Sequence, residues 1–383
     1  MYSVAYIILF LIYAAMALLY HVSTSDTYKM WLKVISVVLL IFFFGFRGFV
    51  GDDWIIYYPN FDGMYHDNLS NIFVSVGASD FEPGFSLLQA LCKFLYPEYH
   101  FFVFVCCVIN CILLYNFFKR QVDNLPLVIM VFVCMSGIEL QINLLRNSMA
   151  LFMCINALRF IEERRFVPFL LICLLATTIH ISSIIFIPLY FVIHKHYSKW
   201  IYLSLLLFAT VFLLMRINFI GPLLISVASR MGEVYEELVR AYIEGEYAKM
   251  QGVISFGFFE RLMTGLLIFC YYDKLVTINK SNILFINTFL LYFFSFAFLR
   301  EFDIAARRIA LLFVFSYWII WCDLFKCFAV KGNKLIFTSF LICYGVLKVF
   351  SMTNEPKAEY DNILFGAKSY EERYTIYMLT KKE

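Results

Sequence analysis

Arginine side chains interrupt long apolar stretches of this 383-residue sequence. A charged group near the centre of a membrane helix costs about 2.5–3.5 kcal/mol on insertion scales, so such residues are candidates for function. The planar guanidinium group fits carboxylate and phosphate groups better than a lysine ammonium group does. The candidate anion-binding residues are Arg47, Arg146, Arg300, Arg307 and Arg308. The sequence therefore predicts a site for a ligand that carries phosphate or carboxylate.

Acidic residues and one histidine occur in similar positions. Asp52 and Asp53 follow a glycine-containing turn, and Tyr57 lies four residues after Asp53. Glu82 precedes a short apolar segment, and His180 lies midway along a longer one. Carboxylates and neutral histidines can act as general bases, so we expect Asp53, Glu82 and His180 to be catalytic. His180, when protonated, can instead donate to a diphosphate, and Asp52 and Tyr57 are candidates for ligand contacts.

Each of these residues also has a simpler interpretation. The two aspartates can form a solvated pair in an interfacial loop, and Glu82 can merely favour a helix N-terminus. Arg146 can lie in a short loop with its side chain reaching the interface, whereas in the functional interpretation it binds the ligand together with Asn147. Arg307 can pair with an acid one helical turn earlier, and a lone histidine such as His180 is usually a hydrogen-bonded core residue.

The composition predicts an all-α membrane protein with many spans. Hydrophobic residues make up 62% of the chain and charged residues 15%, against roughly 45–50% and about 25% in soluble domains. The net charge of +3, without a basic stripe, gives no support for nucleic-acid binding. A spanning helix needs about 20 mainly apolar residues. Such runs lie near residues 2–20, 32–46, 101–118, 125–140, 144–161, 200–216, 259–277, 282–299, 308–325 and 334–350. We expect one transmembrane domain over residues 1–351 and a polar tail over 352–383.

Basic loops orient these spans, because cytoplasmic loops carry an excess of lysine and arginine. Placing the basic loops on one side requires residues 84–96 to dip into the membrane without crossing it. It also requires residues 167–193 to form two half-helices that meet near His180. Irregular backbone at membrane depth is tolerated only where it is buried in protein or lines a wet cavity. This topology leaves two larger outer loops, about 47–83 and 217–258, and places the candidate arginines on the outer side.

The sequence contains no cofactor motif. The eleven cysteines lie in or beside apolar runs without Cys-x-x-Cys spacing, which is typical of buried free cysteine. Phosphate-binding loops and dinucleotide fingerprints are absent from the sequence. We therefore expect neither cofactor nor metal. The alternative is a metal site formed by Asp52, Asp53 and Glu82.

Four short motifs occur in a fixed order along the first 200 residues. They are Arg47-Gly48…Gly51-Asp52-Asp53…Tyr57, Glu82-Pro83-Gly84-Phe85, Arg146-Asn147-Ser148-Met149-Ala150 and His180-Ile181-Ser182-Ser183. In this order they resemble the EpsG-like family, which comprises Wzy-type polymerases of O-antigen, capsule and exopolysaccharide repeat units. Asn147 stands where relatives commonly have glutamine. The doubled acid leaves two candidates for the family's acidic position, and we choose Asp53.

The resemblance implies an inverting membrane glycosyltransferase of the GT-C type. Its fold would be a bundle of about 10–12 transmembrane helices with short re-entrant or broken helices. The many cations, with no clear cluster of metal ligands, indicate a metal-independent mechanism. The donor would be a glycan on undecaprenyl diphosphate, and the acceptor a repeat unit on the same carrier, at the periplasmic face of the bacterial inner membrane. Membrane lipid and a chain-length regulator protein are the further expected partners. Arginines would stabilise the departing diphosphate, and Asp53 or His180 would deprotonate the acceptor hydroxyl.

Three other functions are compatible with the sequence. An O-antigen ligase releases the same carrier and differs only in its acceptor. A flippase for lipid-linked oligosaccharides would be expected to show an internal repeat of the bundle, and the sequence shows none. A membrane acyltransferase would require its catalytic histidine to face the acyl donor.

Overall fold

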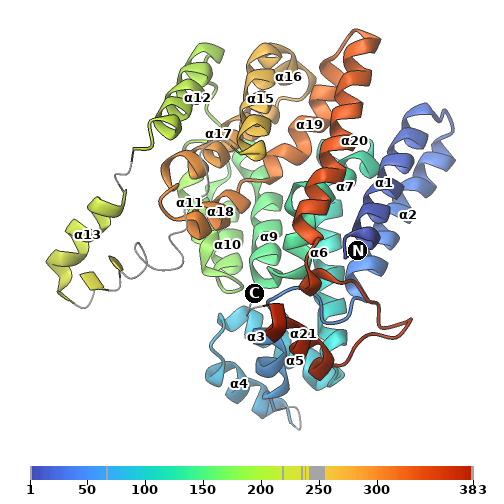
Figure 1. Ribbon diagram of the computed structural model, residues 1–383, viewed down its shortest axis with the longest axis vertical. Helices are drawn as coiled ribbons and strands as arrows, with labels where there is room; N and C mark the ends of the chain where they lie inside the picture. The colour runs from blue at the N-terminus through green and yellow to red at the C-terminus, as the bar shows by residue number, and fades with distance from the viewer. Residues whose placement is uncertain are drawn as a thin grey trace. The chain divides into compact units, whose positions relative to one another are not determined.

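The chain folds into helices in the computed structural model (Figure 1). The structure describes residues 2–65, 68–217, 220–233, 236–237, 239–240 and 255–380. Within these residues there is no β-strand, only an isolated bridge between Arg47 and Asn362. The prediction of an all-α protein is thus confirmed. The helices form two compact units, one of Met1–Val192 with Val330–Glu383 and the other of Ile193–Ala329.

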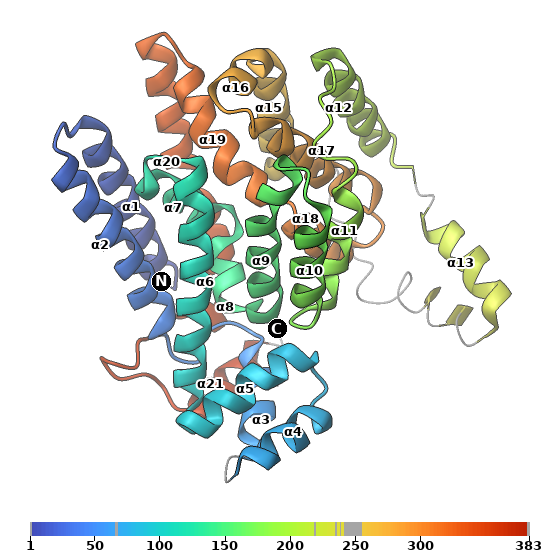
Figure 2. The ribbon, with the colours of Figure 1, turned by 180° about the vertical axis from the view of Figure 1, so that it is seen from behind.

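The first unit consists of helices that alternate in direction, because short connections make neighbouring helices antiparallel. Its longer helices are α1 (Val4–Val22), α2 (Asp26–Gly45), α6 (Tyr99–Gln121), α9 (Leu145–Glu162) and α20 (Lys331–Thr353). Between α6 and α9 lie α7 (Leu125–Phe132), a kink (Val133–Gly137) where Met135 and Ser136 have non-helical backbone angles, and α8 (Ile138–Ile142). After α9 comes α10 (Phe166–Thr177), and α9 packs against both α6 and α10 (Figure 2).

Five helices of the described residues are long and apolar enough to cross a membrane. They are α1, α2, α6, the combined segment Leu125–Ile142 and α20. A sixth candidate is the pair Ile304–Leu311 and Phe315–Cys327, bent by 58°. These helices confirm a multi-pass membrane protein. They are fewer than the expected ten to twelve because several apolar runs form helices of only 10–17 residues, such as Phe166–Thr177 and Asn282–Phe298.

Both interruptions expected in the membrane segments are present. The segment at 84–96 forms α5 (Pro83–Leu95), whose 13 residues extend only about 20 Å. The segment at 167–193 divides into α10, a 3₁₀ turn (Ile181–Ile185) and α11 (Phe186–Leu189). The backbone at His180 is extended, with φ −156° and ψ 126°, and separates these helical pieces. The chain is therefore broken at the histidine where the half-helices were predicted to meet.

The first outer loop and the C-terminal residues fold together in the first unit. The loop contains α3 (Trp54–Asp62) and α4 (Leu69–Ala78), and the C-terminal residues contain a 3₁₀ turn (Pro356–Ala358) and α21 (Tyr370–Thr380). Ile363 donates its backbone N–H to the carbonyl of Phe46 at 2.9 Å. The ring of Tyr370 stacks on that of Tyr58 with centroids 4.6 Å apart. The segment expected as a polar tail thus covers the start of the outer loop.

The second unit carries the remaining helices. They are α12 (Lys199–Leu214), α13 (Ile220–Met231), α15 (Phe256–Cys270), α16 (Tyr272–Ile278), α17 (Asn282–Phe298), α18 (Asp303–Leu311) and α19 (Phe315–Cys327). α13 occupies the start of the outer loop expected at 217–258. Residues 241–254 of that loop lie outside the described residues.

Candidate active site around Arg146

The four motifs lie at helix ends on one side of the first unit, because the helices that carry them alternate in direction. Hydrogen bonds between the motifs fix their arrangement. Asn143 Oδ1 accepts the backbone N–H of Asp52 at 2.8 Å, which joins the first outer loop to the turn before α9. The carbonyl of Thr178 accepts the backbone N–H of Gly84 at 2.8 Å, which joins the start of α5 to the break after α10. Segments separated by up to about 130 residues therefore share one site.

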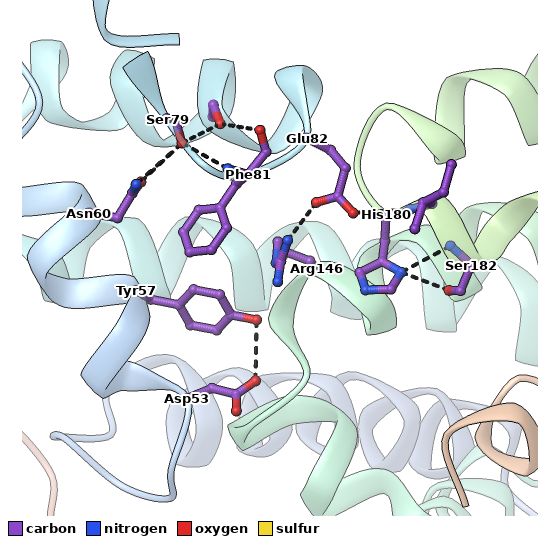
Figure 3. A network of polar contacts seen from close by, with 11 residues as sticks. Asp53, Tyr57, Asn60, Ser79, Phe81, Glu82, Arg146, His180 and Ser182 are labelled. Carbon is purple, nitrogen blue, oxygen red and sulfur yellow. Dashed lines mark hydrogen bonds and ion pairs between the residues drawn. The ribbon is translucent and has the colours of Figure 1, made fainter. Parts of the chain in front are cut away.

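An ion pair between Arg146 and Glu82 lies at the centre of this site (Figure 3). Arg146 Nη1 is 2.6 Å from Glu82 Oε2, and the two side chains are 23% and 19% exposed. Glu82 Oε1 accepts the backbone N–H of Ile181 at 3.1 Å. Burial alone raises the pKa of Glu82, but hydrogen bonds from backbone N–H groups and the Arg146 guanidinium outweigh it, so this pKa lies below its ordinary value. Glu82 is therefore a carboxylate that positions Arg146 and the backbone after His180.

Aromatic rings surround the guanidinium of Arg146. Its central carbon lies 4.3 Å from the ring centroid of Phe81, 5.8 Å from that of Tyr57 and 5.9 Å from that of Phe85. A cation near the faces of aromatic rings is stabilised, and the planar group loses little freedom there. Arg146 Nε is buried and has no hydrogen-bond partner among the described residues. The guanidinium is thus held in a fixed plane while part of its donor capacity is unused.

The two aspartates of the first motif have different partners. Asp52 Oδ2 forms an ion pair with Lys357 Nζ at 3.0 Å, in the C-terminal segment. Asp53 instead accepts a hydrogen bond from the hydroxyl of Tyr57 at 3.3 Å (Figure 3). Burial, together with the nearby Asp53 carboxylate, raises the pKa of Tyr57, so the phenol stays protonated and donates. Asp53 is therefore the aspartate that belongs to the group around Arg146.

Two glycines allow close approaches between the motifs. At Gly51 the backbone φ is +90°, a conformation that other residues rarely adopt, and a Cβ there would lie 2.6 Å from a side-chain carbon of Ile142. At Gly84 a Cβ would lie only 2.8 Å from the carbonyl oxygen of Thr178. This oxygen accepts the N–H of Gly84, so a side chain would push the start of α5 away from the break.

His180 lies beside the ion pair and is half-buried (Figure 3). Its Nδ1 accepts the backbone N–H of Ser182 at 3.2 Å and lies 2.8 Å from the hydroxyl of that residue. A ring nitrogen that accepts an N–H carries no proton itself, so in the neutral ring the proton is on Nε2. The neutral imidazole can therefore offer an Nε2–H donor to a ligand.

Arg47 and Asn147 are both buried. Arg47 is 3% exposed, and it donates to the carbonyls of Phe44 at 2.6 Å and Ile142 at 3.3 Å, at the ends of α2 and α8. Such cations stabilise helix C-termini, so we assign Arg47 to the support of the site. Asn147 is 6% exposed, and its Oδ1 has no hydrogen-bond partner within the described part of the chain.

The other predicted arginines belong to the second unit. Arg300 is half-buried between α17 and α18, and Arg307 and Arg308 are exposed on α18. The neighbouring Glu301 accepts the backbone N–H groups of Ile220 at 2.9 Å and Gly221 at 2.8 Å, at the start of α13. A role of these three arginines in ligand binding stays a prediction, separate from the group around Arg146.

No group of three or more His, Cys, Asp or Glu side chains that could hold a metal ion occurs among the described residues. The alternative prediction was a metal site formed by Asp52, Asp53 and Glu82. Two of these three carboxylates are instead paired with cations. Asp52 pairs with Lys357, and Glu82 pairs with Arg146.

Three residues near the site were not predicted. Phe81 and Phe85 flank Glu82 in the sequence, so their place beside Arg146 could have been inferred from the motif. Lys357 lies about 300 residues from its partner Asp52, and no local pattern links the two.

Comparison with known proteins identifies the family. A family profile described as the EpsG family matches residues 30–365. No curated protein and no solved structure matches the chain. The profile covers most of the chain, including all four motifs, so the resemblance seen in the sequence is confirmed. The chain belongs to the EpsG family, which is linked to exopolysaccharide synthesis.

Proposed function

We propose that this protein is a membrane glycosyltransferase that polymerises undecaprenyl-diphosphate-linked oligosaccharide repeat units into O-antigen or a related surface polysaccharide. One observation carries the proposal. The guanidinium of Arg146 is fixed by Glu82 and aromatic rings at a break in the membrane helices, and its side chain is still 23% exposed. Such a group is suited to bind a diphosphate.

In the proposed reaction, a hydroxyl of the acceptor repeat unit attacks the anomeric carbon of the donor sugar. A new glycosidic bond forms as the bond to the diphosphate oxygen breaks, with inversion at that carbon. Negative charge develops on the departing undecaprenyl diphosphate, and the N–H groups of Arg146 stabilise it. Removing one preorganised donor of this kind typically lowers kcat by about 10²–10³-fold.

The proton of the acceptor hydroxyl passes to Asp53 in this proposal. The competing base is His180, but its Nδ1 already accepts the N–H of Ser182 and its Nε2 carries the proton in the neutral ring. His180 then donates to the diphosphate or to a sugar hydroxyl. Tyr57 stays protonated and orients the Asp53 carboxylate. Glu82 is a positioning residue for Arg146, because its lowered pKa makes it a weak base.

The site is proposed to face the periplasm, in the inner membrane of a bacterium. The basic loops at the other ends of the helices support this orientation. Arg300, Arg307 and Arg308 are proposed to contact the second lipid-linked substrate, since a polymerase binds two carriers. A chain-length regulator is the protein partner we expect.

Purified protein in proteoliposomes tests the proposal, with a synthetic undecaprenyl-diphosphate repeat unit as the only glycan. A polymerase should yield a ladder of carrier-linked products and release one undecaprenyl diphosphate for each bond formed. If the repeat unit is transferred only after lipid A core or protein is added, the protein is a ligase. If it crosses the bilayer without growing, the protein is a flippase. Either outcome would overturn the proposal.

A further inference from the structure

A turn in the C-terminal segment presents two large apolar side chains to the surroundings. Phe365 is 80% exposed and Leu364 is 55% exposed. The turn is well fixed, because Asn362 accepts the backbone N–H of Leu364 on its side chain at 3.0 Å and that of Phe365 on its carbonyl at 2.9 Å. Gly366 completes it with a φ of +95°. A fixed, exposed apolar turn requires a partner, because water solvates it poorly.

The turn is attached to the C-terminal end of α2. Ile363 donates its N–H to Phe46 O at 2.9 Å, and Asn362 forms the isolated bridge with Arg47. The exposed tip is therefore held in a fixed position at the C-terminal end of α2, which is one of the candidate spans.

The apolar tip continues the exposed side of α2. Residues with exposed fractions between 36% and 59% recur along that helix at helical spacing, and they are Trp31, Val34, Ile35, Val38 and Phe42. An apolar stripe on a membrane-spanning helix contacts lipid. The ring of Phe365 lies 6.2 Å from the ring of Phe42, the last residue of the stripe. The turn thus extends a lipid-facing surface beyond the end of its helix.

We propose that the turn Asn362–Gly366 is a lipid anchor, and that Leu364 and Phe365 insert into the bilayer on the side of the membrane where Arg146 lies. The partner of these two side chains is lipid, at the boundary between headgroups and acyl chains. Exposed aromatic and aliphatic side chains of peripheral segments lie at this depth. The anchor would hold the C-terminal segment whose Lys357 pairs with Asp52. It depends on the placement of α2 in the membrane and is independent of the proposed reaction.

Site-specific photo-crosslinking of the full-length protein in its native membrane tests the anchor. The photoreactive residue p-benzoylphenylalanine replaces Phe365, and mass spectrometry identifies the adduct. Phe42, in the lipid-facing stripe, is the positive control. The negative control is Glu355, a residue before the turn whose charged side chain is 57% exposed. Phe365 is so exposed that its replacement should leave folding intact, which monodisperse elution verifies.

We expect a phospholipid adduct at positions 365 and 42 and none at 355. A protein adduct at 365 would mean that another chain covers the turn, and would overturn the anchor. The same holds if position 42 captures lipid and position 365 captures nothing.

Discussion

Replacing Arg146 with lysine tests whether diphosphate binding needs the planar guanidinium group or only a positive charge. Arg146→Lys keeps the charge and enough length to approach Glu82, from which Nη1 is now 2.6 Å away. It removes the planar group that lies 4.3 Å from the ring centroid of Phe81. It also removes the paired, coplanar N–H donors of the guanidinium group, which a lysine ammonium group does not replace. Folding and catalysis should therefore respond very differently.

The two effects can be estimated from the contacts. Lysine retains part of the cation–π attraction and of the mostly buried ion pair, so the loss of folding stability should be about 1 kcal/mol. This loss corresponds to a decrease in Tm of a few degrees. Loss of one donor to the developing charge should lower the polymerisation rate by about 100-fold or more.

Arg159→Lys is the matched control. Arg159 lies on the same helix as Arg146, is exposed, and places its guanidinium 4.5 Å from the ring centroid of Phe160. Both variants are measured in proteoliposomes by the rate of appearance of carrier-linked ladder products, with Tm followed in parallel. The control should match the wild type in both. The expected loss for a missing donor is about 100-fold. A rate for Arg146→Lys within about threefold of the wild type would therefore refute the proposed binding of the diphosphate by the Arg146 guanidinium group.

Further substitutions test the remaining contacts. Asp53→Asn should abolish polymerisation because it removes the proposed base. Asp52→Asn should only reduce it, because it removes a partly exposed ion pair with Lys357 that contributes about 0–1 kcal/mol. Similar losses in the two variants would refute the assignment of Asp53 as the base. Gly84→Ala should lower both Tm and activity because the added Cβ would meet Thr178 O at 2.8 Å, whereas Gly77→Ala, with open space around it, should be tolerated. Glu82→Gln should lower Tm at neutral pH. The folded-state pKa of Glu82 is lowered, so its contribution is complete above the unfolded-state pKa of about 4.3 and is lost as the pH falls through the folded-state value. The Tm difference from wild type should therefore shrink on acidification, and a constant difference would contradict the ion pair.

Much of the first unit could be predicted from apolar run length alone. A 13-residue apolar segment is too short to cross a membrane, and α5 has this length. The need to keep basic loops on one side predicted the break near His180, where the backbone is extended. The kink at Val133–Gly137 could not be predicted, since the positive φ of Ser136 has no signature in an apolar run.

The members of the candidate site were more predictable than their pairing. Arg146 was identified as a charged side chain in apolar sequence, where it is costly, and Glu82 was identified by its place directly before a short apolar segment. Their direct contact depends on how α5 meets the break after α10, which is a long-range packing outcome. Asp53 was chosen over Asp52 from the sequence, but the ion pair of Asp52 with Lys357 could not be predicted, because Lys357 lies in a segment whose composition suggested only a polar tail.

Arg146 is proposed to bind the diphosphate of the lipid carrier. A cryo-electron microscopy structure of the protein in lipid nanodiscs with bound undecaprenyl diphosphate would show whether it does. We expect phosphate oxygens at about 2.7–2.9 Å from the Arg146 guanidinium nitrogens, the distance of charge-assisted hydrogen bonds. A diphosphate bound elsewhere, with Arg146 contacting only Glu82 and its aromatic neighbours, would contradict the proposed role of Arg146.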